Sequence, residues 1–184
     1  MARHHVESDL DAIASGGTSR PIVRWGDPIL ARACSEVDTS DPSLTRLVAD
    51  MVVTMRAAGG VGLAANQVGV PLRVFVFECP DDTDSIRTGV MLNPALQSVP
   101  VSQRSLSLSE EGCLSIPGLH HELARQSQVT VTGLDFLDDP QVVHGTGLLA
   151  RCLQHECDHL DGMLYVDRLP ARTRRAMLAS FDRS

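Results

Sequence analysis

Lysine is absent from the sequence, in which all sixteen basic residues are arginine. This bias is typical of coding in a GC-rich genome and carries no functional weight. Aromatic residues make up only 3% of the chain, which excludes an aromatic core, so aliphatic side chains must fill the interior. The opening residues MARHHVESDL contain no continuous apolar run and therefore predict neither a signal peptide nor a membrane anchor. We expect a cytoplasmic location.

Excess positive charge is missing as well, since the net charge is −7 and the isoelectric point is near 5.4. This balance disfavours binding of nucleic acid or of an anionic membrane by the body of the protein, so we expect neither as a partner. One local exception is a cluster of arginines near the C-terminus: Arg168, Arg172, Arg174, Arg175 and Arg183. An ordinary solvated helix face is the simpler interpretation, and a transient ribosome contact is the alternative.

Five cysteines, an odd number without a secretory signal, favour free thiols or metal ligands over a disulfide framework. A length of 184 residues with 43% hydrophobic and 21% charged content predicts one globular domain with a substantial core. Residues 1–20 are polar, bear glycine and serine and lack periodicity, so we expect a mobile extension there and a single catalytic domain over residues 21–184.

The apolar pattern predicts an α+β fold with a mixed, largely antiparallel sheet around a central metal-binding helix. Helical spacing of apolar residues begins at Asp41-Pro42 and continues to Met55, with Gly59-Gly60 as a stop. A second helix is expected from Thr146, as N-cap, to Leu160, with Gly162 as its stop. The remaining expected elements are strands over 71–79, 88–94 and 128–137, a short strand over 163–166, and a final helix from residue 170.

The second helix carries the sequence QHECDH, with two histidines four residues apart. Residues i and i+4 lie one above the other on a helix face, so His155 and His159 can place two imidazole nitrogens on one ion. Glu156 is turned by about 100° from His155 and lies beside the ion, where a general base for an activated water belongs. Two polar helix histidines without a metal are the alternative.

The third ligand decides the class of enzyme. The residues after His159 include neither glutamate nor histidine, only Asp161, Asp167 and Asp182. The extended zinc-peptidase pattern HExxHxxGxxH ends here in Tyr165, which disfavours that group.

Helix geometry then excludes the two cysteines on this helix as the third ligand. Cys157 is about 200° round the helix from His155, and Cys152 lies roughly 7–8 Å below the level of the ion, too far for a sulfur that must approach within about 2.3 Å. Buried free thiols are the expectation for Cys152, Cys34 and Cys79.

Cys113 remains, in the stretch SEEGCLSIPG. Gly112 allows close approach of the chain, and Pro117-Gly118 turns it soon afterwards. Two histidines and a thiolate leave a fourth position open, which is the pattern of a catalytic site.

The stretches GVGLAANQVG, EGCLS and QHECDH, with the opening VRWGDPIL, together resemble the motifs of the peptide deformylase family, in the family's order and over about residues 20–168. The resemblance implies hydrolytic removal of the N-formyl group from formyl-methionine on nascent bacterial polypeptides. It also implies Fe2+ as the metal, with Ni2+, Co2+ or Zn2+ as substitutes.

The resemblance further assigns roles to residues. Gln67 and the backbone N–H of Leu114 would stabilise the oxyanion, while Glu156 transfers protons; a surface loop glutamine is the alternative for Gln67. Glu111 and Arg125 would support the Cys113 loop, the alternative being a surface ion pair. Candidate substrate contacts are Gly60 and Gly62, which could let the substrate backbone lie close, and the apolar Val61, Leu148 and Leu114, with core packing as the alternative for these three.

Two positions depart from the family pattern. His120 stands where many members hold the peptide with an arginine, and Arg151 stands where some have an apolar residue near the methionine pocket. We expect Arg151 to lay its stem along the pocket and turn its head to water. The competing functions are a zinc peptidase that cuts internal bonds and a metal-binding protein without activity. Glu156 and Gln67 argue against the silent protein, which has no chemical need for either.

Overall fold

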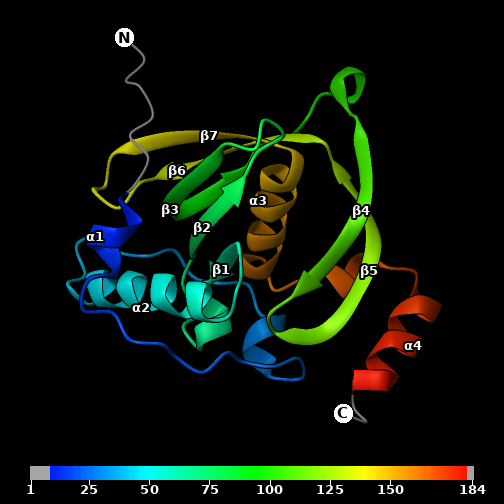
Figure 1. Cartoon of the computed structure of the whole chain (residues 1–184), viewed down its shortest axis with the longest axis horizontal. Coiled ribbons are helices and arrows are strands. Elements are labelled where there is room, and N and C mark those ends of the chain that lie inside the picture. The colour runs from blue at the N-terminus through cyan, green and yellow to red at the C-terminus, as the bar shows by residue number, and fades with distance from the viewer. Residues whose placement is uncertain (1–8, 182–184) are drawn as a thin grey trace.

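The computed structural model describes residues 9–181, which form two antiparallel sheets around one central helix (Figure 1). The larger sheet has the strand order β1-β2-β3-β6-β7. Its strands are β1 (Gly62–Ala64), β2 (Val74–Pro80), β3 (Ile86–Leu96), β6 (Gln128–Leu134) and β7 (Pro140–Thr146). The second sheet is a hairpin of β4 (Leu106–Cys113) and β5 (Ile116–Gln126). The predicted α+β class is confirmed.

Helices cover both faces of the larger sheet because its central strands are apolar on both sides. In β2, Val74 and Val76 pack with helix α2 (Ser43–Ala57), whereas Phe75 and Phe77 pack with helix α3 (Gly147–Leu160). Successive strand residues point to opposite faces, so one apolar run supplies two cores.

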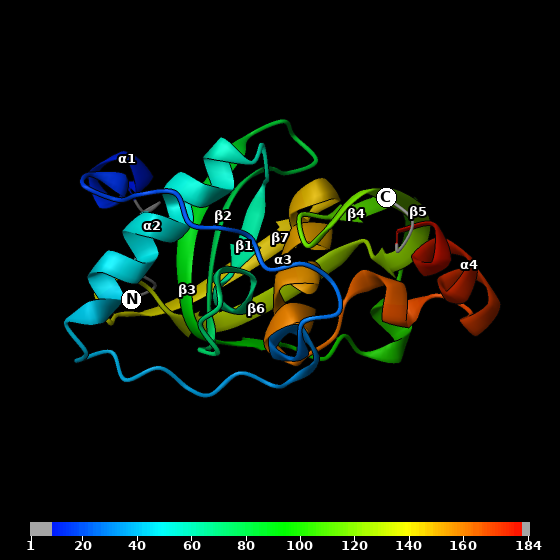
Figure 2. The ribbon, with the colours of Figure 1, turned by 90° about the horizontal axis from the view of Figure 1, so that it is seen from below.

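The hairpin β4–β5 lies on the other side of α3, which is therefore enclosed between the two sheets (Figures 1 and 2). Every residue of α3 from Leu149 to Leu160 is buried, including its charged ones. Helix α4 (Ala171–Phe181) packs outside the hairpin, where Trp25 meets Phe181 edge to face at 6.0 Å. None of the helices in residues 9–181 has the length and apolarity needed to span a bilayer.

The N-terminal boundary differs in part from the expectation of an extension over residues 1–20. Residues 1–8 lie outside the described part of the chain. Helix α1 (Leu10–Ala14) buries Leu10 in the α2 core, and the backbone N–H groups of Thr18 and Arg20 donate to Asp50 and Thr54 of α2 at 2.7 and 2.9 Å. For residues 9–20 this packing argues against a segment outside the domain.

Of the other predicted elements, the helices are confirmed and one strand is wrong. Both long helices, their glycine stops and the final helix are confirmed. Thr146 is the N-cap residue of α3, but its hydroxyl donates to Asp82 rather than capping the helix. The strand expected over 163–166 is wrong, because residues 165–168 form a 3-10 helix. The other 3-10 segments in the described part of the chain are Pro28–Ala31, Ala65–Val68 and Val101–Gln103.

Candidate metal centre

Three side chains from two elements converge between the hairpin and α3. His155 and His159 stand one turn apart on α3, and Cys113 ends β4, where the pairing with β5 shifts register. The His159 Nε2 atom lies 3.2 Å from Cys113 Sγ and 3.2 Å from His155 Nε2. We call these three residues, whose ligand atoms all lie within 4.8 Å of one another, the ligand cluster.

The ligand cluster fits a small divalent ion. An ion held tetrahedrally at roughly 2.1 Å from two imidazole nitrogens and about 2.3 Å from a thiolate sets these atoms roughly 3.4–3.6 Å apart. The observed separations of 3.2 Å are close to that geometry. Burial and the neighbouring His155 hold the pKa of His159 well below its ordinary value, so this imidazole is neutral, as a metal ligand must be.

Glu111 orients His155 for this task. Its Oε1 atom lies 2.7 Å from His155 Nδ1, which fixes the proton on Nδ1 and leaves Nε2 facing the ligand cluster. Burial by itself would raise the pKa of Glu111, but hydrogen bonds from His155 and Arg125 hold it well below its ordinary value. Tyr165 stacks against the His155 ring at 6.3 Å and donates its hydroxyl to the Leu119 carbonyl at 2.9 Å.

Glu156 is placed beside the ligand cluster without joining it. Its side chain is buried, and its Oε2 atom has no hydrogen-bond partner among the described residues. Burial raises the pKa of Glu156 to about 7. A β-carbon at Gly62 would stand 2.5 Å from Glu156 Oε1 and 2.7 Å from Cys152 Sγ. Glycine is thus required here for the approach of α3 to β1, whereas the sequence suggested only the approach of a substrate.

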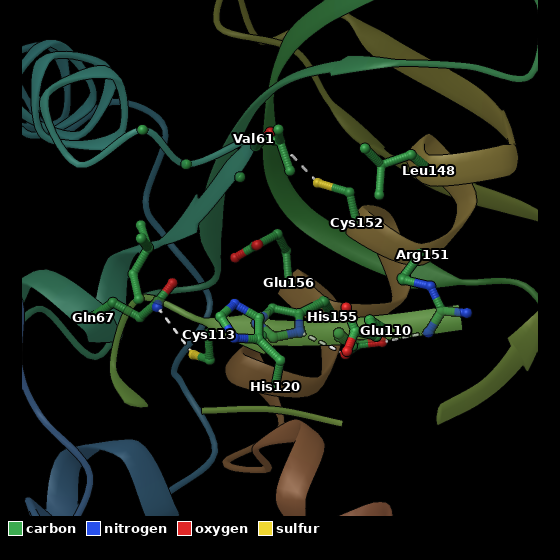
Figure 3. Close-up of a pocket in the computed structure, with 16 residues that line it drawn as sticks. Val61, Gln67, Glu110, Cys113, His120, Leu148, Arg151, Cys152, His155 and Glu156 are labelled. Atoms are coloured by element: carbon green, nitrogen blue, oxygen red, sulfur yellow. Dashed lines mark hydrogen bonds and ion pairs between the residues drawn. The ribbon is translucent and has the colours of Figure 1, made fainter. Parts of the chain in front are cut away.

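Gln67 is buried, which excludes a surface loop glutamine. Its Oε1 atom accepts from the Ala64 backbone N–H at 2.9 Å, and this bond turns the amide N–H2 toward Cys113 Sγ at 3.6 Å and Ser115 Oγ at 3.2 Å. Leu114 follows Cys113 directly and lines the same cavity. Figure 3 shows the Gln67 amide directed toward Cys113 of the ligand cluster.

A cavity of about 310 Å³ opens onto the ligand cluster. Its mouth carries two partly exposed apolar side chains, Val61 and Leu148, and His120 of β5 stands at its edge (Figure 3). A β-carbon at Gly112 would stand 2.4 Å from His120 Cδ2, so the glycine lets this ring lie against β4. Twelve residues of the predicted site line this cavity: Gly60, Val61, Gly62, Gln67, Glu111, Cys113, Leu114, His120, Leu148, Arg151, His155 and Glu156.

The expectation for the head group of Arg151 is wrong. Arg151 lines the cavity, but its guanidinium is buried and donates to Glu111 Oε2 at 2.8 Å instead of reaching water. Arg125 is buried too, which excludes a surface ion pair with Glu111. Its NH1 donates to Asp158 at 2.6 Å, and Asp158 also accepts from Arg168.

Asp158 and Tyr165 were missed from the sequence. Asp158 directly precedes the candidate ligand His159, which is a signal in the sequence, but nothing in the sequence identifies the partners of Asp158. The remaining cysteines behave as expected: Cys34, Cys79, Cys152 and Cys157 are buried free thiols, and none of them joins the ligand cluster.

Comparisons of the sequence and of the structure with known proteins all find deformylases. A model of the polypeptide deformylase family matches residues 19–175. Peptide deformylase 1 of Streptomyces avermitilis is 51% identical over 162 residues, which are 88% of this chain and 75% of that protein. Peptide deformylase 2 of Streptomyces coelicolor is 47% identical over 91% of this chain and 92% of its own. The crystal structure of peptide deformylase from Ehrlichia chaffeensis superposes with a TM-score of 0.82 at 32% identity, covering 90% of this chain and 96% of that one.

Proposed function

Because the chain belongs to the polypeptide deformylase family, we propose that its ligand cluster holds a divalent metal ion beside the proton-transferring carboxylate of Glu156. Members of this family remove the N-formyl group from formyl-methionine at the start of nascent polypeptides by metal-dependent hydrolysis, and this is the activity of the chain. The observation that carries the residue assignment is the pairing of three converging ligand atoms with a buried carboxylate oxygen that has no hydrogen-bond partner within residues 9–181.

We propose Fe2+ as the resident ion, with Ni2+, Co2+ or Zn2+ as substitutes, because two imidazoles and one thiolate suit all four. When bound, such an ion supplies a Lewis acid that polarises water and the formyl carbonyl. His155 and His159 would each present an Nε2 atom to the ion, and Glu111 keeps the His155 ring in the orientation that points Nε2 at it. Metal analysis of anaerobically purified protein tests the identity of the ion.

The proton transfers are assigned to Glu156. Its free Oε2 accepts a proton from the attacking water and later delivers one to the departing amine of methionine. A pKa of about 7, raised by burial, suits a group that must both take and release a proton near neutral pH. Gly62 keeps the carboxylate in place by leaving room for Oε1.

Two donors are assigned to the oxyanion that forms from the formyl oxygen. The Gln67 amide is aimed by the hydrogen bond from the Ala64 backbone N–H, and the Leu114 backbone N–H is next to the thiolate ligand. Donors that are held in position before the reaction contribute about 3 kcal/mol each.

The substrate side of the cavity is assigned by its chemistry. Val61, Leu148 and the methylene stem of Arg151 form the pocket for the methionine side chain. Gly60 and Gly62 line the part of the cavity in which the substrate backbone would lie, and His120 contacts the peptide farther along. His120→Arg is expected to lower KM for formylated tripeptides more than for formyl-methionine alone.

Nascent formylated polypeptides are the substrates, and we place the reaction in the cytoplasm, where they are made. A transient contact of the C-terminal arginines with the ribosome is a further proposal. Arg168 and Arg174 are paired with Asp158 and Asp167, so Arg172 and Arg175 are the exposed cations available for it. Arg183 lies outside the described residues.

The test of the function is formate release from formyl-Met-Ala by the metal-loaded protein, with unformylated peptides as the control. The proposal expects formate from the formylated peptide and no cleavage of internal bonds. Metal-loaded protein that cuts unformylated peptides and releases no formate would identify a peptidase instead.

A further inference from the structure

Glu111, the carboxylate behind His155, is shared by three donors. Arg125 binds both of its oxygens, with Nε–Oε2 at 3.0 Å and NH2–Oε1 at 2.6 Å, and His155 Nδ1 lies 2.7 Å from Oε1. The third donor is NH1 of Arg151, at 2.8 Å from Oε2. Arg151 reaches this carboxylate from α3, one helical turn before His155, whereas Arg125 reaches it from β5.

Arg151 also joins α3 to both strands of the hairpin. NH1 donates to the Leu123 carbonyl of β5 at 2.9 Å, and NH2 donates to the Ser107 carbonyl of β4 at 3.0 Å. Figure 3 places its guanidinium on the His155 side of the cavity, turned away from Leu148. The planar fork of arginine can make these bonds together, which the single ammonium of lysine cannot reproduce.

The buried charges explain why a second cation is needed. Arg125 divides its charge between two carboxylates, Glu111 and Asp158, at 2.6 Å from each, and Asp158 has Arg168 as its second cation whereas Glu111 has Arg151. A buried carboxylate without a full counter-charge is costly, and Arg151 completes the balance at Glu111. Arg151 is itself only 6% exposed, so its charge and that of Glu111 are paired away from solvent.

We propose that Arg151 is a positioning residue for the metal centre, which acts through Glu111 on the orientation of His155 and through Ser107 and Leu123 on the seating of the hairpin that carries Cys113. This inference rests on the proposed function, because it assumes that the ligand cluster holds an ion. It assigns to Arg151 a role at the ligand cluster in addition to its stem in the methionine pocket.

Arg151→Met tests the proposal, because methionine keeps most of the stem and removes all three hydrogen bonds of the guanidinium. The readouts are the affinity for Co2+, measured by competition with a chelator, and the visible absorption of the Co2+ protein, which reports ligand geometry. We expect affinity to fall about 10–100-fold, as for other groups that orient metal ligands, and the absorption bands to shift. Arg151→Lys restores the charge but not the fork, so it should recover part of the affinity.

Two controls separate positioning from stability. Arg104→Met removes an exposed arginine that bonds the Val99 carbonyl at 3.1 Å, and it should leave Co2+ affinity unchanged. Val48→Ala opens a cavity in the α2 core, on the opposite face of the larger sheet from α3, so it should lower the melting temperature without moving the Co2+ spectrum. If Arg151→Met does not fold, Arg151→Lys carries the same measurement.

Wild-type Co2+ affinity and spectrum in a folded Arg151→Met or Arg151→Lys protein would overturn the proposal. Formate release is measured separately on the wild type. If the wild type binds Co2+ but releases no formate, the proposed function fails, while the comparison of Co2+ binding still decides the role of Arg151.

Discussion

Glu156 follows the ligand His155 directly on α3, yet its carboxylate lies outside the ligand cluster. We therefore expect Glu156→Gln to keep its metal content while kcat falls by about 10²–10⁴-fold, because proton transfer alone is removed. Metal analysis and steady-state formate release measure the two effects. Cys113→Ala is the matched control and should lose the metal. A metal-free Glu156→Gln protein would identify Glu156 as a ligand and contradict the assignment.

Gly62 gives a second prediction at this scale. Alanine there puts a β-carbon 2.5 Å from Glu156 Oε1 and 2.7 Å from Cys152 Sγ, so the helix side chains must shift. Overpacking of this kind costs about 1–3 kcal/mol, and the displaced carboxylate should lower kcat more than it changes KM.

The double variant Gly62→Ala/Cys152→Ala is the matched test for Gly62, because it removes the thiol that alanine meets and opens space into which the alanine can shift away from Glu156. Partial recovery of kcat is expected relative to Gly62→Ala alone. Wild-type turnover in the single variant would show that the glycine is not required for the position of Glu156.

The contact between helix α2 and the N-terminal segment depends on one buried carboxylate. Asp50 accepts from the Thr18 backbone N–H at 2.7 Å and from the Nε atoms of Arg20 and Arg46 at 2.9 Å each. Burial alone would raise its pKa, but the bonds from Thr18 and Arg20 and the charge of Arg46 hold it below the ordinary value. We expect Asp50→Asn to lower the free energy of unfolding by about 1–3 kcal/mol at pH 7.

The lowered pKa of Asp50 determines how its contribution to the free energy of unfolding changes with pH. The contribution of Asp50 is fully present above the pKa of about 3.9 in the unfolded chain, and it is lost as the pH falls through the lower pKa of the folded chain. The difference in melting temperature between the wild type and Asp50→Asn should therefore narrow as the pH falls from 5 toward 2. A constant difference over this range would mean that the carboxylate charge is not what stabilises the contact.

The elements that could be predicted are those whose burial leaves a pattern in the sequence. Helix α2 has one apolar stripe and a glycine stop, and β2 is an apolar run between turn residues. The hairpin leaves no burial pattern of this kind: residues 106–110 of β4 alternate leucine and serine before a glutamate, but all five are exposed. Residues 163–166 have strand-like composition, but Asp167 accepts from the Leu164 N–H at 2.9 Å and favours a 3-10 turn.

The candidate site could likewise be predicted only where a local pattern in the sequence marks its residues. Spacing along one helix indicates His155, Glu156 and His159, and elimination plus resemblance supplied Cys113. The head group of Arg151 could not be placed, because its partners lie on β4 and β5, which were not predicted. Contacts between elements distant in the chain depend on topology, which no local pattern records.

For the whole molecule, the ligand cluster joins the hairpin to the α3 layer. An ion that binds the folded chain and not the unfolded one stabilises it by RT ln(1 + [L]/Kd), about 4 kcal/mol at a thousandfold excess over Kd. Removal of the metal by a chelator should therefore lower the melting temperature and speed hydrogen exchange in β4 and β5 more than in β2 and β3. The Cys113→Ala protein should respond little to the chelator. Equal acceleration in both sheets would mean that the ion does not hold the hairpin.

The enclosure of α3 between two sheets also has a consequence for the order of synthesis. A chain made from its N-terminus completes β4 and β5 before the ribosome has added Arg151 and His155, the α3 partners of the buried Glu111. Until α3 has been made, the hairpin has no helix to pack against, and one face of the larger sheet is uncovered. Each new molecule thus acquires the core around α3 and its catalyst in the same late step, and a chain stopped before α3 has neither.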